Sequence, residues 1–139
     1  MKLKWAITSL LSVQLLIVMS AQGRSTQDGI YTDAQAKRGE AIYVKSCAGC
    51  HQPDLAGDGQ TPPLTGKDFN MDWNDGPVSD LFDRTRISMP ADKAGSLAPA
   101  EVADVIAFLL SKGGFPAGQT ELPPDAAALK AIKFVAPKP

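Results

Sequence analysis

The stretch Cys47-Ala48-Gly49-Cys50-His51 contains both cysteines and the only histidine of this 139-residue chain. Two thiols separated by two residues and followed at once by an imidazole form the attachment pattern of a c-type haem. Each thiol can add to a vinyl group on the same edge of the macrocycle, and the next residue then supplies the proximal iron ligand. The motif therefore predicts one haem c, attached covalently through Cys47 and Cys50, with His51 bound to the iron.

Three other uses of the motif are weaker hypotheses. A structural zinc site usually takes four Cys or His ligands, and the whole chain offers three. A thioredoxin-like redox pair would lie between a strand and a helix, whereas the residues before Cys47 are predicted to be helical. A disulfide between Cys47 and Cys50 is reasonable in an oxidising compartment, but it gives no reason for His51.

The N-terminus has the features of a secretory signal peptide. Two lysines precede an apolar run over 5–19, and small residues at 21–23 allow cleavage before Arg24. Cleavage after Ser20 is an alternative, and so is an uncleaved membrane anchor, although the run is short for a span of about 20 residues. We therefore expect 1–23 to be a signal peptide and the protein to be periplasmic, since bacteria attach c-type haem outside the cytoplasm.

The remaining chain has the size of one small domain. Loss of two lysines with the signal segment changes the formal net charge from −1 to −3. A domain of this size buries only about two-thirds of its unfolded surface, so a covalently held haem would add substantially to its core. The acidic balance gives no reason to expect nucleic-acid binding, which calls for a basic face. Membrane contact is expected only if the signal segment is uncleaved.

A first helix is predicted from about Asp33 toward Cys47. Thr32 is a good N-cap, and Gln35 stands three residues later, which makes a capping box. Gly39 in the middle of this helix costs about 1 kcal/mol against alanine. A packing reason for it is expected, namely the close approach of another helix.

Two further helices are predicted from their start signals and apolar spacing. One begins at 75–77 and ends in extended chain at 87–90, because residues before proline avoid the helical region. The other begins near Pro99 and stops at Gly113-Gly114. Residues 51–70 are predicted to be a loop, since glycine and proline interrupt any regular element there.

The predicted organisation is a flexible segment over 24–31, a helical domain over 32–114 and a C-terminal extension over 115–139. The extension is rich in proline and glycine, with a short helix expected over 126–132 and a frayed end from Val135. It could wrap the domain or dock onto a partner.

Met71 and Met89 are the thioethers that remain after the signal segment. Met89 is the better candidate for the sixth iron ligand, because it follows a predicted helix, is stiffened by Pro90 and lies 38 residues beyond His51. Either methionine could instead fill the core. Ligation by His51 and Met89 would leave no iron position for a substrate, so the sequence predicts electron transfer, no enzyme activity and no catalytic residue.

Trp73 and Arg86 are candidates for lining the haem. An indole N–H or a guanidinium can bind a buried propionate, and a buried charge needs such a partner. Either residue could equally lie in the core or on the surface.

The chain carries three motifs in order, namely Cys47–His51, Pro62-Pro63-Leu64-Thr65-Gly66 and Met89-Pro90, and its final predicted helix carries Phe108. In these features it resembles the class I cytochromes c. The resemblance covers about Thr32 to Gly114. It implies an all-α, class I cytochrome c fold in which three main helices surround one covalently bound haem, here with the short C-terminal helix added.

The resemblance also implies roles for particular residues. In that family the first and last helices cross at a small residue and an aromatic, positions that Gly39, Tyr43 and Phe108 match. The family's proline whose carbonyl orients the proximal imidazole matches Pro62. Pro63 departs from the commonest pattern.

A narrower resemblance is to the cytochrome domain fused to, or serving, PQQ-dependent alcohol dehydrogenases. It implies a quinoprotein dehydrogenase as the partner. The segments that carry it are Arg38-Gly39-Glu40, Asp80-Leu81-Phe82, Met89-Pro90-Ala91-Asp92-Lys93-Ala94-Gly95-Ser96-Leu97, Gly114-Phe115-Pro116-Ala117-Gly118 and Glu121-Leu122-Pro123.

The leading functional hypothesis is a periplasmic carrier of single electrons that accepts from a quinoprotein dehydrogenase and gives to a terminal oxidase or another cytochrome. An alternative is a tightly bound cytochrome subunit of a dehydrogenase complex, with the tail over 115–134 as a docking element. A haem sensor or peroxidase is a third hypothesis. It needs a labile sixth ligand and usually a distal acid–base residue, and the chain has no second histidine.

Overall fold

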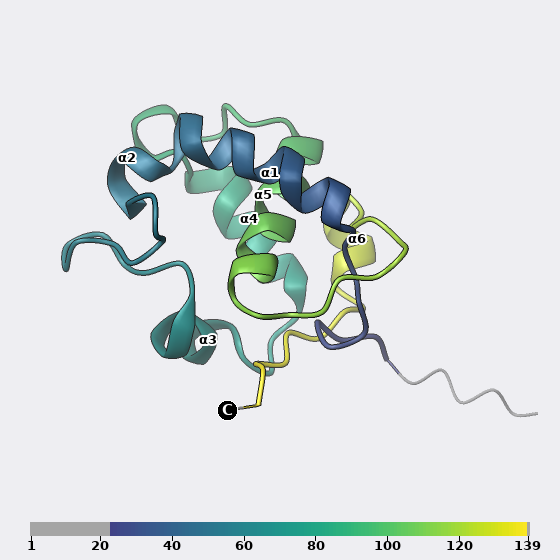
Figure 1. The fold of residues 1–139 in the computed structure, drawn as a ribbon. Coiled ribbons are helices and arrows are strands. Elements are labelled where there is room, and N and C mark those ends of the chain that lie inside the picture. Colours follow the sequence, from purple (N-terminus) through teal and green to yellow (C-terminus); the bar gives the residue numbers. More distant parts are fainter. Residues whose placement is uncertain (1–22, 139) are drawn as a thin grey trace, which may run out of the picture.

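The computed structural model describes residues 23–138, and over this range the chain is helical, with two isolated β-bridges and no strand (Figure 1). The expected all-α fold is confirmed. The expected signal segment, 1–23, lies outside the described residues apart from Gly23. No helix within the described range is long and apolar enough to cross a membrane. The elements are α1 Asp33–Ser46, α2 Ala48–His51, α3 Gly66–Trp73, α4 Val78–Ser88, a 3₁₀ turn Ala91–Lys93, α5 Pro99–Lys112 and α6 Ala126–Leu129.

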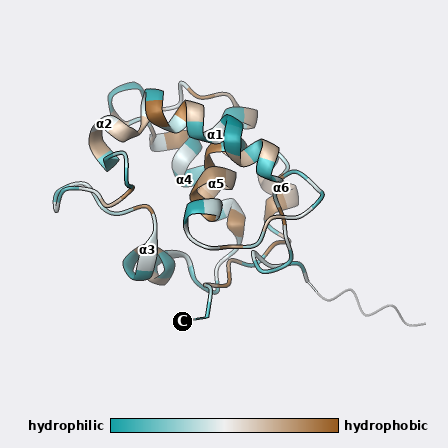
Figure 2. Cartoon of the chain, in the orientation of Figure 1, coloured by the Kyte–Doolittle hydropathy of each residue, from teal (hydrophilic) through white to brown (hydrophobic). Residues whose placement is uncertain are grey.

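The crossing of α1 over α5 organises the domain. The middle of α5, from Val102 to Leu110, is buried throughout, and Figure 2 shows much of it as hydrophobic. At the crossing, a Cβ added to Gly39 would lie 1.8 Å from the carbonyl oxygen of Asp104. The Tyr43 and Phe108 rings pack next to this point, with centroids 5.2 Å apart. The glycine in the first helix therefore has the packing reason expected for it, which is direct contact between two helix backbones.

Gln35 takes a different role from the one expected. The side chain of Thr32 accepts a hydrogen bond from the Gln35 N–H at 3.1 Å, so the N-cap is confirmed. The Gln35 side chain does not complete the capping box. It is buried, donates to the carbonyl of Leu122 at 3.0 Å and accepts from the Leu122 N–H at 2.7 Å. A buried amide satisfied on both sides ties α1 to the C-terminal extension.

Arg38 joins the same elements from the outer side. Its guanidinium donates two hydrogen bonds to Asp104, both at 2.9 Å, and two to Glu121, both at 3.0 Å. Hydrogen bonding by Arg38 lowers the pKa of Glu121 below its ordinary value. The arginine thus connects α1, α5 and the extension at one point.

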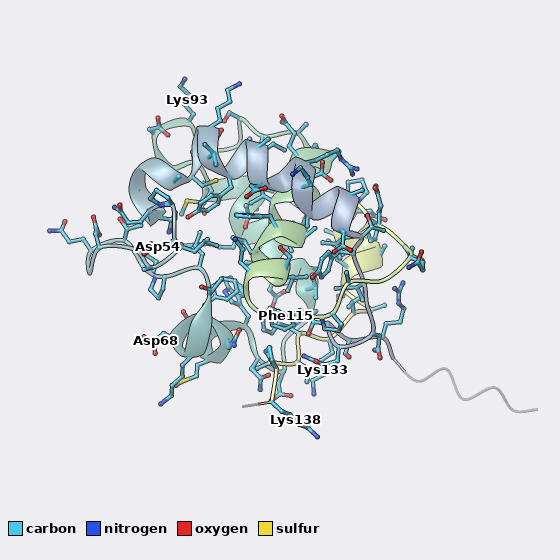
Figure 3. All side chains as sticks on the ribbon, in the orientation of Figure 1. Asp54, Asp68, Lys93, Phe115, Lys133 and Lys138 are labelled. Carbon is cyan, nitrogen blue, oxygen red and sulfur yellow. The ribbon has the colours of Figure 1, made fainter. Side chains whose placement is uncertain are left out.

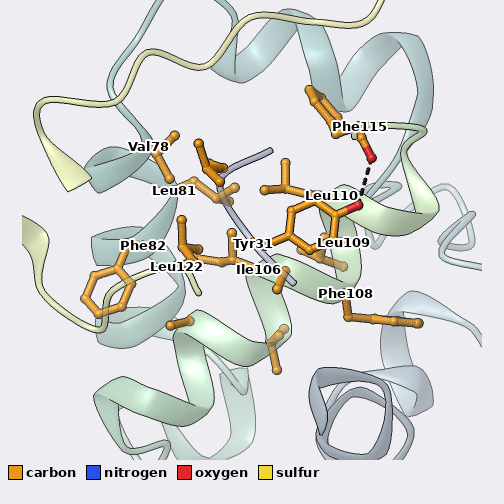
Figure 4. Close-up of a cluster of buried hydrophobic side chains, with 14 of the residues drawn as sticks. Tyr31, Val78, Leu81, Phe82, Ile106, Phe108, Leu109, Leu110, Phe115 and Leu122 are labelled. Carbon is orange, nitrogen blue, oxygen red and sulfur yellow. Dashed lines mark hydrogen bonds between the residues drawn. The ribbon is translucent and has the colours of Figure 1, made fainter. Parts of the chain in front are cut away.

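The segment 24–31, which we expected to be flexible, is part of the folded domain. Thr26, Ile30 and Tyr31 are buried. The Tyr31 hydroxyl donates to the Phe115 carbonyl at 2.7 Å (Figure 4), and the Thr26 N–H donates to the Lys133 carbonyl at 3.0 Å. No local pattern indicates this packing, because the partners lie about a hundred residues away and the segment is mostly polar.

The C-terminal extension wraps around the domain. Its apolar side chains are buried against the helices, and its end is held further than expected, because the Val135 N–H donates to the Thr26 hydroxyl at 2.9 Å. The Ala136 N–H donates to the Asn74 side chain at 2.9 Å, so the prediction of fraying from Val135 is wrong. The buried members of the extension are Phe115, Leu122, Leu129, Ile132 and Phe134.

The prediction of a continuous loop over 51–70 is also wrong, because α3 begins at Gly66. Its N-cap, Thr65, makes no side-chain cap bond, so the usual start signal is missing. The helix depends instead on one apolar face, where Phe69 and Trp73 stand four residues apart with ring centroids at 6.3 Å. The predicted helix from 75–77 is α4, which continues through Ser88 before the chain becomes extended.

Gly39→Ala should lower the free energy of unfolding by about 2–3 kcal/mol, because an added Cβ forces the two helix backbones apart. Gly49→Ala is the matched control, since a Cβ at that helical glycine would meet nothing within 4 Å. It should leave stability unchanged or slightly raised. Urea unfolding of both variants provides the measurement, and equal midpoints for the two would contradict the role of Gly39.

Glu121→Gln should destabilise the domain near pH 7 and have no effect in strong acid. Because Arg38 lowers the pKa of Glu121 from 4.5, the ionised carboxylate stabilises the fold above that value. This stabilisation is lost as the pH falls through the lowered pKa of the folded state. Melting temperatures of variant and wild type, measured from neutral pH downward, should converge. Glu40→Gln makes the same change on the exposed face of α1. Its melting temperature should follow that of the wild type at every pH.

Candidate haem site

The Cys47–His51 motif forms the junction of α1 and α2. Cys47 is the C-cap of α1, and its N–H donates to the Tyr43 carbonyl at 2.8 Å. The same residue is the N-cap of α2, and its carbonyl accepts from the N–H groups of Cys50 at 3.2 Å and His51 at 3.0 Å. The motif is therefore one tight turn that follows directly from α1, and both thiols and the imidazole line one cavity.

The other uses of the motif fit this geometry poorly. Cys47 and Cys50 form no disulfide, and they follow a helix rather than a strand. No group of three His, Cys, Asp or Glu side chains in the described part of the chain is placed to hold a metal ion. Burial raises the pKa of the Cys47 thiol to about 11, so this group is protonated at neutral pH in the folded chain.

The His51 ring is held by the backbone of Pro62. The ring is buried, with 8% of the residue exposed, and its Nδ1 lies 2.9 Å from the Pro62 carbonyl oxygen. A carbonyl oxygen only accepts, so Nδ1 carries a proton, and Nε2 is the ring nitrogen left for another partner. This bond fixes both the tautomer and the orientation of the ring that the motif predicts as an iron ligand.

A compact loop brings the Pro62 carbonyl to this position. The Gly57 N–H donates to the His51 carbonyl at 3.1 Å, and a Cβ at Gly57 would lie 2.1 Å from the Thr61 carbonyl oxygen. The Asp58 carboxylate accepts from the N–H groups of Thr61 at 2.7 Å and Gln60 at 3.1 Å, and these bonds lower its pKa. The turn that precedes Pro62 is therefore closed by hydrogen bonds on both sides.

A cavity of about 600 Å³ opens beside the motif, a volume in the range of cofactor sites. The walls come from every part of the domain except the terminal segments. They include Pro62 and Leu64 from the loop, Phe69 and Trp73 from α3, Leu81, Arg84 and Thr85 from α4, and Val105 and Leu109 from α5. Leu81 and Leu109 also belong to the buried cluster drawn in Figure 4. Most of the wall is apolar.

The two candidate methionines lie in different environments. Met89 is the residue that ends α4, with its N–H donating to the Thr85 carbonyl at 3.0 Å, and it lines the cavity. Met71 is on α3 with 67% of its surface exposed, and it is not part of the cavity wall. The structure thus brings Met89 to the cavity that His51 lines, and leaves Met71 outside it.

Trp73 and Arg86, the two candidates for lining the haem, also lie in different environments. Trp73 lines the cavity, but Arg86 does not, and its guanidinium instead lies 3.9 Å from the Asp83 carboxylate. The arginine on the wall is Arg84. The helical period explains the difference, because Arg84 shares a face with Leu81, whereas Arg86 is turned well away from it. The same spacing was readable in the sequence and would have indicated Arg84.

These residues fit a haem c. Two thiols stand at the attachment spacing, a fixed imidazole offers Nε2, a thioether comes from a separate element, and the wall is mainly apolar. Soft sulfur and imidazole nitrogen are the axial donors that cytochromes c use for iron.

Residues 34–109, which run from α1 to most of α5, match the family model described as cytochrome c oxidase, cbb3-type, subunit III. The chain belongs to this cytochrome family. It is therefore a c-type cytochrome, and the domain implies haem c and electron transfer with redox partners.

Similarity to a longer protein extends over part of the chain. Thiosulfate dehydrogenase from Stutzerimonas stutzeri (strain A1501) is 37% identical over 81 residues, which are 53% of this chain and 26% of that protein. The match thus spans about a quarter of the length of that relative.

Met89→Ala should keep haem attached but open the iron to carbon monoxide, because the thioether that lines the cavity is removed. Met71→Ala is the matched control, since that side chain is exposed. The measurement is the visible spectrum of each reduced variant before and after addition of carbon monoxide. A response in Met71→Ala and none in Met89→Ala would reverse the assignment.

Proposed function

We propose that this chain is a periplasmic monohaem cytochrome that carries single electrons between redox proteins. The haem is attached through Cys47 and Cys50, and His51 and Met89 fill the two axial positions of its iron. The observation that carries the proposal is the 2.9 Å bond from His51 Nδ1 to the Pro62 carbonyl, in a cavity that also receives Met89. The signal-like segment 1–23 supports export.

The protein's residues suit electron transfer rather than substrate chemistry. Haem, when bound, supplies the one-electron couple of its iron. His51 is held in one tautomer by Pro62, and the Met89 thioether favours a raised reduction potential. The apolar wall of Leu81, Val105 and Leu109 limits water around the site.

The attachment side of the cavity offers a path to the solvent. His51 is buried, whereas Cys50, one residue before it, is exposed. A partner can therefore approach the attached edge of the haem while His51 stays covered. Contacts of this kind are brief and small, which suits a carrier that must leave its partner after each electron.

The donor we propose is a quinoprotein dehydrogenase, and the acceptor a terminal oxidase or another cytochrome. The support is the likeness of several short segments to the cytochrome domain that serves PQQ-dependent alcohol dehydrogenases, including Met89–Leu97 and Gly114–Gly118. This part of the proposal depends on resemblance alone.

A second candidate is a tightly bound cytochrome subunit of a dehydrogenase complex. The partial similarity to a protein named thiosulfate dehydrogenase favours it, since the match covers only 26% of that protein. The extension is less suited to docking than the sequence suggested, because its apolar side chains are buried within the domain. Stable co-purification with a larger chain would favour this candidate over the free carrier.

The test of the proposed function is the visible spectrum of the protein produced with a haem-attachment system. We expect a low-spin spectrum in both redox states, the weak band that methionine gives with ferric iron, and no response to carbon monoxide. High-spin iron or ready binding of carbon monoxide would contradict the closed His51/Met89 site and favour a sensor or peroxidase. The absence of covalent haem would contradict the proposal as a whole.

A further inference from the structure

The helix α3, which forms part of the cavity wall, has few local interactions that stabilise it. The helix contains eight residues, begins without a side-chain cap, and is followed at once by Asn74 and the turn to α4. Isolated helices of this length are unstable in water, so α3 is held in place by what packs against it. Phe69 and Trp73 from this helix nevertheless form part of the cavity wall. Figure 1 shows α3 set apart from the packed group of α1, α4 and α5.

The side chain behind this wall is Phe134, from the C-terminal extension. Phe134 is fully buried, and its ring meets the Phe69 ring nearly edge-on at a centroid distance of 6.2 Å. The Phe134 ring also meets the Phe115 ring, at a centroid distance of 5.2 Å. The rings of Trp73, Phe69, Phe134 and Phe115 thus form a continuous row from the cavity to the base of the extension. Arrangements of this kind contribute beyond the apolar area that they bury.

The backbone around Phe134 is fixed to the turn after α3. The Phe134 N–H donates to the Gly76 carbonyl at 2.7 Å, and its carbonyl accepts from the Asp75 N–H at 2.9 Å. The Lys133 ammonium lies 2.7 Å from the Asp75 carboxylate. The connection between α3 and α4 is therefore tied to one short stretch of the extension.

The N-terminal segment braces this stretch from the opposite side. Ser25 forms a parallel bridge with Lys133, while Pro77 forms an antiparallel bridge with the same residue. Phe134 is consequently set between two segments and has little freedom to move away from Phe69. Figure 3 labels Phe115 and Lys133 in the lower part of the molecule, where these segments meet.

We propose that Phe134 is a positioning residue for the haem cavity, which acts through Phe69 to hold α3 closed over it. The inference rests on the proposed function and adds a role for the extension, namely setting how far water reaches the cavity on the α3 side. The oxidised iron carries one more positive charge than the reduced iron, so admitted water favours the oxidised form and lowers the reduction potential.

Phe134→Ala, produced with haem attached, tests this role by two measurements. Hydrogen exchange of peptides that cover Gly66–Trp73 should become about tenfold faster or more, because α3 loses its packing partner. The midpoint potential should fall below that of the wild type. Phe134→Leu, which keeps most of the side-chain volume, should restore both quantities toward the wild-type values.

Leu122→Ala is the matched control for a merely structural effect. Leu122 is a buried residue of the same extension, but its backbone pairs with Gln35 of α1 and the residue does not line the cavity. This variant should lose stability while the potential and the exchange of α3 stay as in the wild type. Equal falls in potential for Leu122→Ala and Phe134→Ala would overturn the proposal, and so would unchanged exchange of α3 in Phe134→Ala.

Two further outcomes are also decisive. If Phe134→Ala does not accumulate, Phe134→Val is compared with Leu122→Ala by the same two measurements and the same criteria. If the wild type itself carries no covalent haem, the proposed function fails, and the exchange of α3 in the two variants still decides whether Phe134 positions this helix.

Discussion

The backbone contact between α1 and α5 at Gly39 and Asp104 is the constraint on which the haem site depends. It leaves no room for even a Cβ atom, so the two helices have one way to cross. Because α1 ends in Cys47, the crossing fixes where the attachment motif begins. The residues of α5 that follow the contact, Val105 and Leu109, then become the apolar wall opposite that motif. The packing of α1 against α5 therefore also sets the position of the cofactor-attachment motif.

The site combines two candidate ligands, His51 and Met89, with a wall assembled from distant segments. His51 is oriented by a backbone carbonyl, which a side-chain substitution cannot easily remove. Met89 lies at the point where α4 gives way to extended chain, so its place depends on where that helix ends. A protein that transfers electrons gains from such rigidity, because the ligand geometry can stay the same in both oxidation states.

The terminal segments make the domain more than a minimal haem-binding unit. The segment 24–31 and the extension pair with each other, and the extension contacts the connection between α3 and α4. An ion pair of Arg38 and a hydrogen bond of Gln35 join α1 to the extension as well. The extension therefore supports the side of the cavity that the three large helices leave open.

The sequence by itself determined the cofactor chemistry, because the Cys47–His51 spacing is a local property and suits few other uses. It also determined the main helices, whose caps and apolar spacing are local, and it favoured Met89 from its neighbour Pro90. Only the tertiary structure decided that α3 exists and that the terminal segments are packed. These features depend on contacts between residues far apart in the chain, such as Thr26 with Val135 and Phe69 with Phe134, and no local pattern encodes such contacts.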